Sequence, residues 1–95
     1  MTNERAAVKV SADAAAPRFT LYGRNYCHLC AEMLAALAPL REQFGFAVEV
    51  VDVDSDATLE ARFGSLVPVL AHAGTELCHY HLDAAKVRAY LAKIR

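Results

Sequence analysis

Two cysteines, Cys27 and Cys30, stand three positions apart in the stretch LYGRNYCHLCAEML, which covers residues 21–34. The stretch opens with apolar residues typical of a strand, passes through a turn, and continues with residues typical of a helix. Two thiols at this spacing can exchange electrons with other thiols, or they can hold a metal ion. The choice depends on the elements that position the two thiols and on the residues that those elements bring near.

The residues on either side of the cysteine pair predict a strand before it and a helix after it. The run FTLYG is rich in β-forming residues and ends at Gly23. Gly45 is a suitable C-terminal cap for the helix, whereas Pro39 lies inside the pattern and predicts a kink or an early break. The helix is indicated by apolar residues on one face, at spacings of four, four, three and four: Leu29, Met33, Leu37, Leu40 and Phe44.

A second strand and a short helix are expected next. The run FAVEVVDV is too rich in β-branched residues for a helix, and we expect it to form a buried strand. Asp54 or Ser55 can cap a short helix that continues through Arg62 and stops at Gly64.

The remaining chain predicts a hairpin followed by a last helix. The run VPVLAHAGTELCHYH, residues 67–81, reads as two strands that turn at Ala73 and Gly74. Asp83 can cap the last helix, whose apolar residues share one face: Val87, Leu91 and Ile94.

The predicted order is therefore β-α-β-α-β-β-α. A helical crossover joins the first two strands, so they should be parallel, while the last two form an antiparallel hairpin. The expected fold class is α/β, a four-stranded mixed sheet with helices on both faces. In this arrangement, the cysteine pair lies at the C-terminal end of the first strand and at the N-terminus of the first helix.

Length and charge limit what the protein can be. The chain has 95 residues, enough for one domain, and a formal net charge of −1. We expect residues 1–16 to form a flexible N-terminal tail, with AVKV as a possible short edge strand, and residues 17–95 to form the domain. No basic face for nucleic acid, no membrane span and no signal peptide are visible, so we expect a cytoplasmic protein that binds neither nucleic acid nor membrane. We also expect a monomer.

The position at a helix N-terminus favours redox chemistry for the pair. Unpaired N–H groups and the positive end of the helix dipole stabilise an anion there, and can lower a cysteine pKa to about 3.5–7.5. Cys27 would then attack a substrate disulfide, and Cys30, one turn further along the helix, would resolve the mixed disulfide. A C-x-x-C at a strand-to-helix junction favours this role over two ordinary buried cysteines.

The chain from about Arg18 to Ile94 resembles a glutaredoxin of the thioredoxin-fold superfamily, and most closely a group of short, poorly characterised glutaredoxin-like proteins. The matching stretches are LYGRNYCHLC, EVVDVD and FGSLVPVL. The resemblance implies a thioredoxin-like fold of the glutaredoxin type and thiol–disulfide oxidoreductase activity. It also implies protein or small-molecule disulfides as substrates, a reductase or glutathione as electron donor, and no required cofactor.

The same resemblance assigns further site residues. Arg24 stands where glutaredoxins carry a basic residue before the cysteine pair. Val67 and Pro68 match a Val-Pro pair that is joined by a cis peptide bond in that family. A cis turn there would leave the Val67 backbone free to pair with a substrate strand. Tyr26, together with Asn25, shapes the substrate groove or simply fills the loop.

Two departures from the glutaredoxin pattern bear on activity. Glutaredoxins carry two glycines after the fourth strand, where they hold glutathione, but here His79 and Tyr80 occupy the stretch CHYHLD. We therefore expect weak or no glutathione dependence, although Arg24 could still meet a carboxylate of this reductant. His28 stands between the cysteines, where a cationic imidazole would stabilise the Cys27 thiolate or would simply be solvated.

The metal alternative rests on the pattern C-x₂-C…C-x₂-H. Its four candidate ligands are Cys27, Cys30, Cys78 and His81. Residues 78 and 81 would face opposite sides of a continuing strand, so only an early strand end would bring them together. The alternative function is thus a non-catalytic zinc or iron–sulfur module, or a protein-interaction module, on the same fold.

Asp52, Asp54 and Asp56 resemble the start of a calcium loop, but the later positions of that loop are not matched in this sequence.

Overall fold

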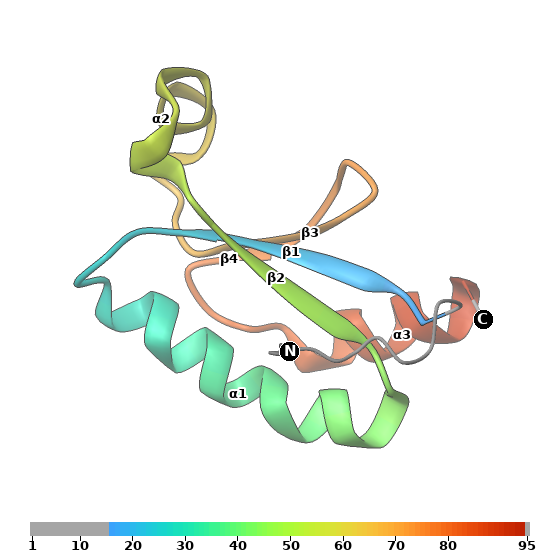
Figure 1. Ribbon diagram of the computed structural model, residues 1–95. Helices are drawn as coiled ribbons and strands as arrows, with labels where there is room; N and C mark the ends of the chain where they lie inside the picture. Colours follow the sequence, from blue (N-terminus) through green and yellow to red (C-terminus); the bar gives the residue numbers. More distant parts are fainter. Residues whose placement is uncertain (1–15, 95) are drawn as a thin grey trace, which may run out of the picture.

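The computed structural model describes residues 16–94, so the expected tail up to residue 15, with its possible strand, lies outside the described residues. Within residues 16–94 the element order is the predicted one, β-α-β-α-β-β-α, with one 3₁₀ turn added (Figure 1). The elements are β1 (Arg18–Gly23), α1 (His28–Phe44), β2 (Ala47–Asp52), the 3₁₀ turn η2 (Val53–Ser55), α2 (Ala57–Phe63), β3 (Val69–His72), β4 (Thr75–His79) and α3 (Ala84–Ile94).

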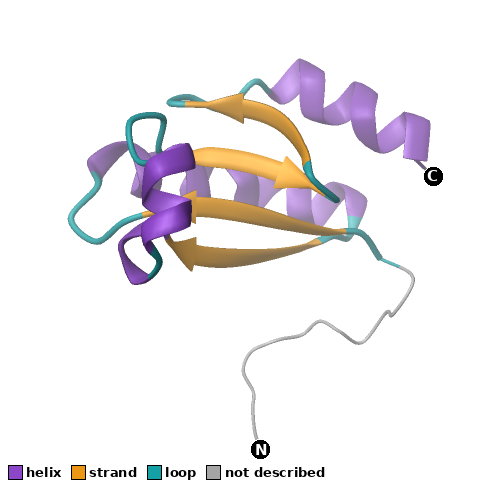
Figure 2. Ribbon diagram, turned by 90° about the horizontal axis from the view of Figure 1, so that it is seen from above, coloured by secondary structure: helices purple, strands orange, loops and turns teal. Residues whose placement is uncertain are grey.

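The four strands form one mixed sheet in the order β2-β1-β3-β4. β1 pairs in parallel with β2 and antiparallel with β3, and β3 pairs antiparallel with β4. α1 and α3 cover one face of the sheet, and α2 lies over the other face near the ends of the strands (Figures 1 and 2). The predicted α/β fold class, with helices on both faces, is confirmed.

Two groups of buried side chains hold these layers together. The larger group lies between the sheet and the helices α1 and α3, and contains Phe19, Leu21, Met33, Leu37, Leu40, Phe46, Leu70, Leu77, Val87 and Leu91. The smaller group lies under α2 and contains Val53, Phe63 and Val69. Because β1 alternates its side chains, Leu21 joins the first group while Tyr22 packs against the second.

β2 is an edge strand, so the prediction that it is buried was wrong. The sheet order leaves one of its edges unpaired in the described structure, and Val50 is 58% exposed. β-branched residues indicate a strand, but they do not tell whether that strand lies at the centre or the edge of the sheet.

α1 continues through Pro39 to Phe44, so the early break considered for this helix does not occur. Pro39 is exposed, while Leu37 and Leu40 on either side of it are buried against the sheet. Their burial holds the helix together across the missing N–H group. Gly45 ends the helix in a left-handed conformation, φ 69°, and its N–H donates to the Arg41 carbonyl at 2.8 Å.

No helix within residues 16–94 has the length and apolar character that crossing a membrane requires.

The cap of α2 is Asp56 rather than the expected Asp54 or Ser55. Its carboxylate accepts hydrogen bonds from the N–H groups of Thr58 and Leu59. Asp52 caps the preceding 3₁₀ turn in the same way, by accepting from the Asp54 N–H at 2.9 Å. Of the three carboxylates that resemble a calcium loop in sequence, Asp52 and Asp56 therefore serve as caps, while the Asp54 carboxylate lies 3.8 Å from the Arg24 guanidinium.

Candidate active site

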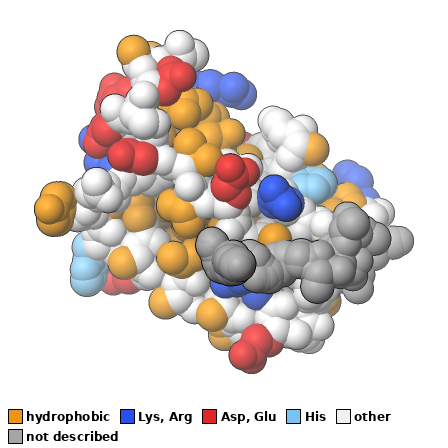
Figure 3. Space-filling model, in the orientation of Figure 1, with side chains coloured by type: hydrophobic (Ala, Val, Ile, Leu, Met, Phe, Trp, Pro, Cys, Tyr) orange, Lys and Arg blue, Asp and Glu red, His pale blue; other side chains and the backbone are white. Residues whose placement is uncertain are grey.

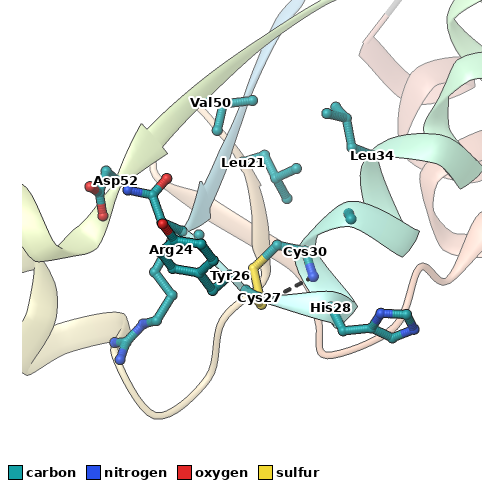
Figure 4. Close-up of a pocket in the computed structure, with 12 residues that line it drawn as sticks. Leu21, Arg24, Tyr26, Cys27, His28, Cys30, Leu34, Val50 and Asp52 are labelled. Carbon is teal, nitrogen blue, oxygen red and sulfur yellow. Dashed lines mark hydrogen bonds between the residues drawn. A yellow bond between two sulfur atoms is a disulfide. The ribbon is translucent and has the colours of Figure 1, made fainter.

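Cys27 and Cys30 are joined by a disulfide at the N-terminus of α1, with their Cα atoms 5.2 Å apart (Figure 4). Cys27 is the N-cap residue of α1 and has an extended backbone. Its Sγ atom accepts a hydrogen bond from the Cys30 N–H at 3.1 Å, as the side-chain oxygen of Ser or Thr does at other helix starts. The Cys27 sulfur atom therefore caps the N-terminus of α1.

This position suits a sulfur anion. Once the disulfide is reduced, the Cys30 N–H and the helix dipole would both stabilise a thiolate at Cys27. The first turn of α1 contains no Asp or Glu that would oppose the negative charge. Both cysteines are partly accessible to solvent.

Gly23 makes close packing at the second cysteine possible. A Cβ atom built at Gly23 would lie 3.0 Å from the Sγ atom and 3.4 Å from the Cβ atom of Cys30. Glycine therefore lets Cys30 pack against the backbone at the end of β1. The sequence predicts only the end of a strand at Gly23. A glycine at a strand end shortly before a C-x-x-C pair is the signal that could have indicated this contact.

A groove of about 580 Å³ opens beside the disulfide, between the N-terminal half of α1 and the ends of β1 and β2 (Figure 4). Its apolar lining includes Leu21, Leu34 and Val50, which are not among the site residues predicted from the sequence. The full lining is Leu21, Gly23, Arg24, Asn25, Tyr26, Cys27, His28, Cys30, Ala31, Leu34, Val50 and Asp52. The loop residue Tyr26 has a left-handed backbone, φ 61°, and its side chain is fully exposed.

Arg24 lines this groove, but its guanidinium is used elsewhere. The Nη2 atom donates to Glu60 Oε2 at 3.0 Å and to the Gly64 carbonyl at 3.1 Å, and lies 3.8 Å from Asp54 Oδ1. In Figure 4 the side chain extends away from the disulfide. Arg24 therefore connects the loop between β1 and α1 to α2. The carboxylates of Glu60 and Asp54 balance its positive charge.

His28 is also turned away from the disulfide (Figure 4). Its Nε2 atom lies 2.8 Å from Glu32 Oε2, one turn along the helix, and the imidazole is 86% exposed. A protonated His28 would thus be paired with Glu32. This geometry agrees with the solvated alternative for His28 rather than with direct stabilisation of the Cys27 thiolate.

The Val67–Pro68 peptide bond is cis, as expected. Pro68 is fully buried, and Val67 packs against the smaller core group under α2. Neither residue lines the groove described above. The structure therefore brings Arg24, Tyr26 and His28 together with the cysteines in one groove and places the Val67–Pro68 turn outside it.

Tyr80 bridges two loops on the Pro68 side. Its backbone is left-handed, φ 64°, a conformation that favours glycine, and its N–H donates to the Pro68 carbonyl at 2.9 Å. Its hydroxyl donates to the Ser65 carbonyl at 2.9 Å. His79 contacts the Tyr80 ring edge-on and lies 2.7 Å from Glu76. The large side chain considered in the sequence analysis therefore spans from the end of β4 to the loop before Pro68.

The four residues of the metal pattern do not form a site. Cys78 is a free, half-buried cysteine that packs against the larger core group, and His81 is exposed. Burial raises the pKa of the Cys78 thiol, against the opposing effect of a hydrogen bond to the Asp83 backbone. Within the part of the chain that the structure describes, no three His, Cys, Asp or Glu side chains are grouped as metal ligands would be.

We predict that Gly23→Ala destabilises the reduced protein by about 1–3 kcal/mol, because the new methyl group would press on Cys30. The free energy of unfolding should be measured in urea with a thiol reductant present. In a Cys30→Ala background, where the sulfur atom is missing, the same substitution should cost much less. An equal cost in both backgrounds would show that the contact with Cys30 is not responsible.

We also predict slow alkylation of Cys78 in the reduced native protein at neutral pH. A raised pKa lowers the thiolate fraction at any given pH, so labelling should increase only as the pH rises above the ordinary thiol range. Mass spectrometry after iodoacetamide treatment at two pH values measures this. Labelling in urea serves as the control, because unfolding should remove the protection. Equally fast labelling in native and unfolded protein at neutral pH would contradict the prediction.

Solved structures of other proteins share this fold. A solution NMR structure of a Nitrosomonas europaea protein is 36% identical, covers 95% of this chain and 98% of its own, and has a TM-score of 0.73. An X-ray structure of an X. campestris protein is 42% identical over 79% of this chain and 96% of its own, with a TM-score of 0.66. Thioredoxin 1 from Thermosipho africanus, 17% identical with a TM-score of 0.55 over 81% of this chain and 97% of its own, shares the fold.

Sequence relatives extend the comparison. An uncharacterised protein of Mycobacterium tuberculosis is 32% identical over 82 residues, which cover 81% of this chain and 84% of the relative. The family profile described as Glutaredoxin-like domain (DUF836) matches residues 18–92. With its disulfide at the start of α1 and its thioredoxin-type fold, this chain belongs to the glutaredoxin-like family.

Proposed function

We propose that the protein is a thiol–disulfide oxidoreductase in which Cys27 is the nucleophile and Cys30 the resolving thiol. The observation that carries this proposal is the Cys27–Cys30 disulfide at the N-terminus of α1, with the Cys30 N–H directed at Cys27 Sγ. Of the two sulfur atoms, the one at Cys27 receives this hydrogen bond, whereas Cys30 packs against the end of β1 at Gly23. Cys27 is therefore the better placed attacking group.

The proposed reaction consists of two exchanges. In the reduced protein, the Cys27 thiolate attacks one sulfur of a substrate disulfide, a mixed disulfide forms, and the other substrate sulfur leaves as a thiolate. The Cys30 thiol then loses its proton and attacks Cys27 Sγ, which forms the Cys27–Cys30 disulfide and releases the second substrate thiol. Two electrons pass from the dithiol to the substrate. A reductant of the thiol class restores the dithiol.

Glutathione is a poor candidate for that reductant. Tyr80 stands where glutaredoxins carry glycine, and its hydroxyl is bound to the Ser65 carbonyl, so its side chain occupies space next to the Pro68 turn. Arg24, the cation proposed to meet a glutathione carboxylate, is already engaged by Glu60 and the Gly64 carbonyl. We therefore propose a protein reductase or another dithiol as electron donor, protein or small-molecule disulfides as substrates, and the reducing cytoplasm as the compartment.

The assignment of roles predicts opposite behaviour for two serine variants. Cys27→Ser should abolish disulfide reduction, because no thiolate remains at the N-terminus of α1. Cys30→Ser should still attack and should accumulate mixed disulfides, which non-reducing gels and mass spectrometry detect. If Cys27→Ser traps substrates and Cys30→Ser does not, the two roles are reversed. A metal that co-purifies with the protein, with no reduction by the wild type, would favour the metal-binding alternative.

The role of Tyr80 predicts that Tyr80→Gly increases turnover with glutathione as sole electron source. Glycine removes the bulky side chain and suits the left-handed backbone at this position. Tyr80→Phe is the matched control, because it keeps the ring and removes only the hydrogen bond to Ser65. Reduction of a small mixed disulfide measures both variants. Robust wild-type turnover with glutathione, lost on Arg24→Ala, would contradict the proposed weak dependence.

A further inference from the structure

The groove beside the disulfide has an apolar surface that the redox reaction itself does not require. Within residues 16–94, the exposed large apolar side chains are Tyr26, Leu34, Val50, Tyr80 and Ile94, and the first three of these all line this groove. Figure 3 shows hydrophobic side chains at the surface between α1 and β2. Exposed apolar side chains gathered in one place indicate a binding surface, whereas single ones are normal.

The charges around the groove select against an anionic partner. The basic and acidic side chains in its lining are Arg24, His28 and Asp52. Arg24 is paired with Glu60, and His28 with Glu32. Asp52 has no ion pair within the described residues: its carboxylate accepts the Asp54 N–H, and its backbone carbonyl accepts from the Ser55 hydroxyl. The charge left uncompensated at the groove is therefore negative. Acidic side chains are also gathered over α2, next to the groove (Figure 3).

The reactive sulfur pair fixes the chemistry of the occupant. Because Cys27 and Cys30 form part of the lining, a molecule in the groove that takes part in the exchange must present a sulfur atom beside its apolar part. The volume of about 580 Å³ accommodates an aliphatic side chain together with the adjoining backbone. The negative charge at Asp52 complements a basic residue of the occupant.

From these observations we infer that the groove recognises a polypeptide substrate whose disulfide cysteine is flanked by a large aliphatic residue and a basic residue. The aliphatic side chain lies between Leu34 and Val50 while Cys27 attacks the neighbouring cysteine. This inference rests on the proposed oxidoreductase function and names its substrate class. The recognition surface lies on the β2 side of the disulfide, outside the Val67–Pro68 turn.

The test measures attack by Cys27 alone, in the reduced Cys30→Ser protein. The probes are short peptides whose cysteine carries a thionitrobenzoate group. One peptide has Leu and Lys beside the cysteine, a second has Ser in place of Leu, and a third has Glu in place of Lys. Cys27 attacks the peptide sulfur, a peptide–Cys27 disulfide forms, and the coloured thionitrobenzoate thiolate leaves. Because the leaving group is constant, differences in second-order rate constant report recognition of the peptide.

The Leu peptide should react roughly tenfold faster than the Ser peptide, a factor that partial burial of one aliphatic side chain can supply. Val50→Thr and Leu34→Ser should each bring this ratio towards one. Ile94→Ser, which removes exposed apolar surface at the end of α3, should leave the ratio unchanged. Asp52→Asn, which can keep its capping hydrogen bond, should reduce the preference for the Lys peptide over the Glu peptide.

The outcomes separate this inference from the proposed function. Equal rates for the Leu and Ser peptides in the parent protein would overturn the groove assignment while leaving Cys27 as the nucleophile. A Leu preference that survives both Val50→Thr and Leu34→Ser would also overturn it. If no probe reacts with the Cys30→Ser protein, the proposed function fails, and this inference fails with it. Circular dichroism of each variant establishes that the fold is retained before the rates are compared.

Discussion

The packing of the first turn of α1 against the end of β1 is the constraint on which the site depends. Cys30 lies against the backbone of Gly23, and its N–H group points at Cys27 Sγ. These two contacts fix where the helix starts relative to the sheet, and therefore where both sulfur atoms stand. Leu21, buried between the sheet and α1, continues the same contact into the core. The chemistry of the pair is thus supported by ordinary helix-on-sheet packing.

The two sides of the disulfide differ in character. On one side, Arg24 binds α2 through Glu60, and Tyr80 binds the Ser65 carbonyl, so polar contacts connect the loops around the Pro68 turn. On the other side, α1 and the edge of β2 leave an open apolar groove. The Tyr80 side chain spans from the end of β4 to the loop that carries Ser65. The open groove leads to the sulfur atoms, and we place substrate recognition there.

Local sequence signals predicted the element order and the position of the cysteine pair, because periodicity and caps such as Gly45 act within a few residues. Features that depend on contacts between distant segments were not predictable. Glu60, which binds Arg24, is 36 positions away, and no local pattern links the two. The same limit explains the misjudged β2, since the exposure of Val50 follows from strand order. Asp56 was missed as a cap because several neighbouring polar residues could have served.

An edge strand rich in β-branched residues is a potential site for pairing with another molecule of the same protein. β2 is such a strand, but it carries the exposed carboxylate of Glu49 within its length and Asp52 at its end. At the opposite edge of the sheet, a bulge between Leu70 and Ala71 interrupts the register of β3 and β4. Both edges therefore carry features that oppose edge-to-edge aggregation. The carboxylates of β2 thus oppose pairing along the same strand that keeps Val50 exposed at the apolar groove.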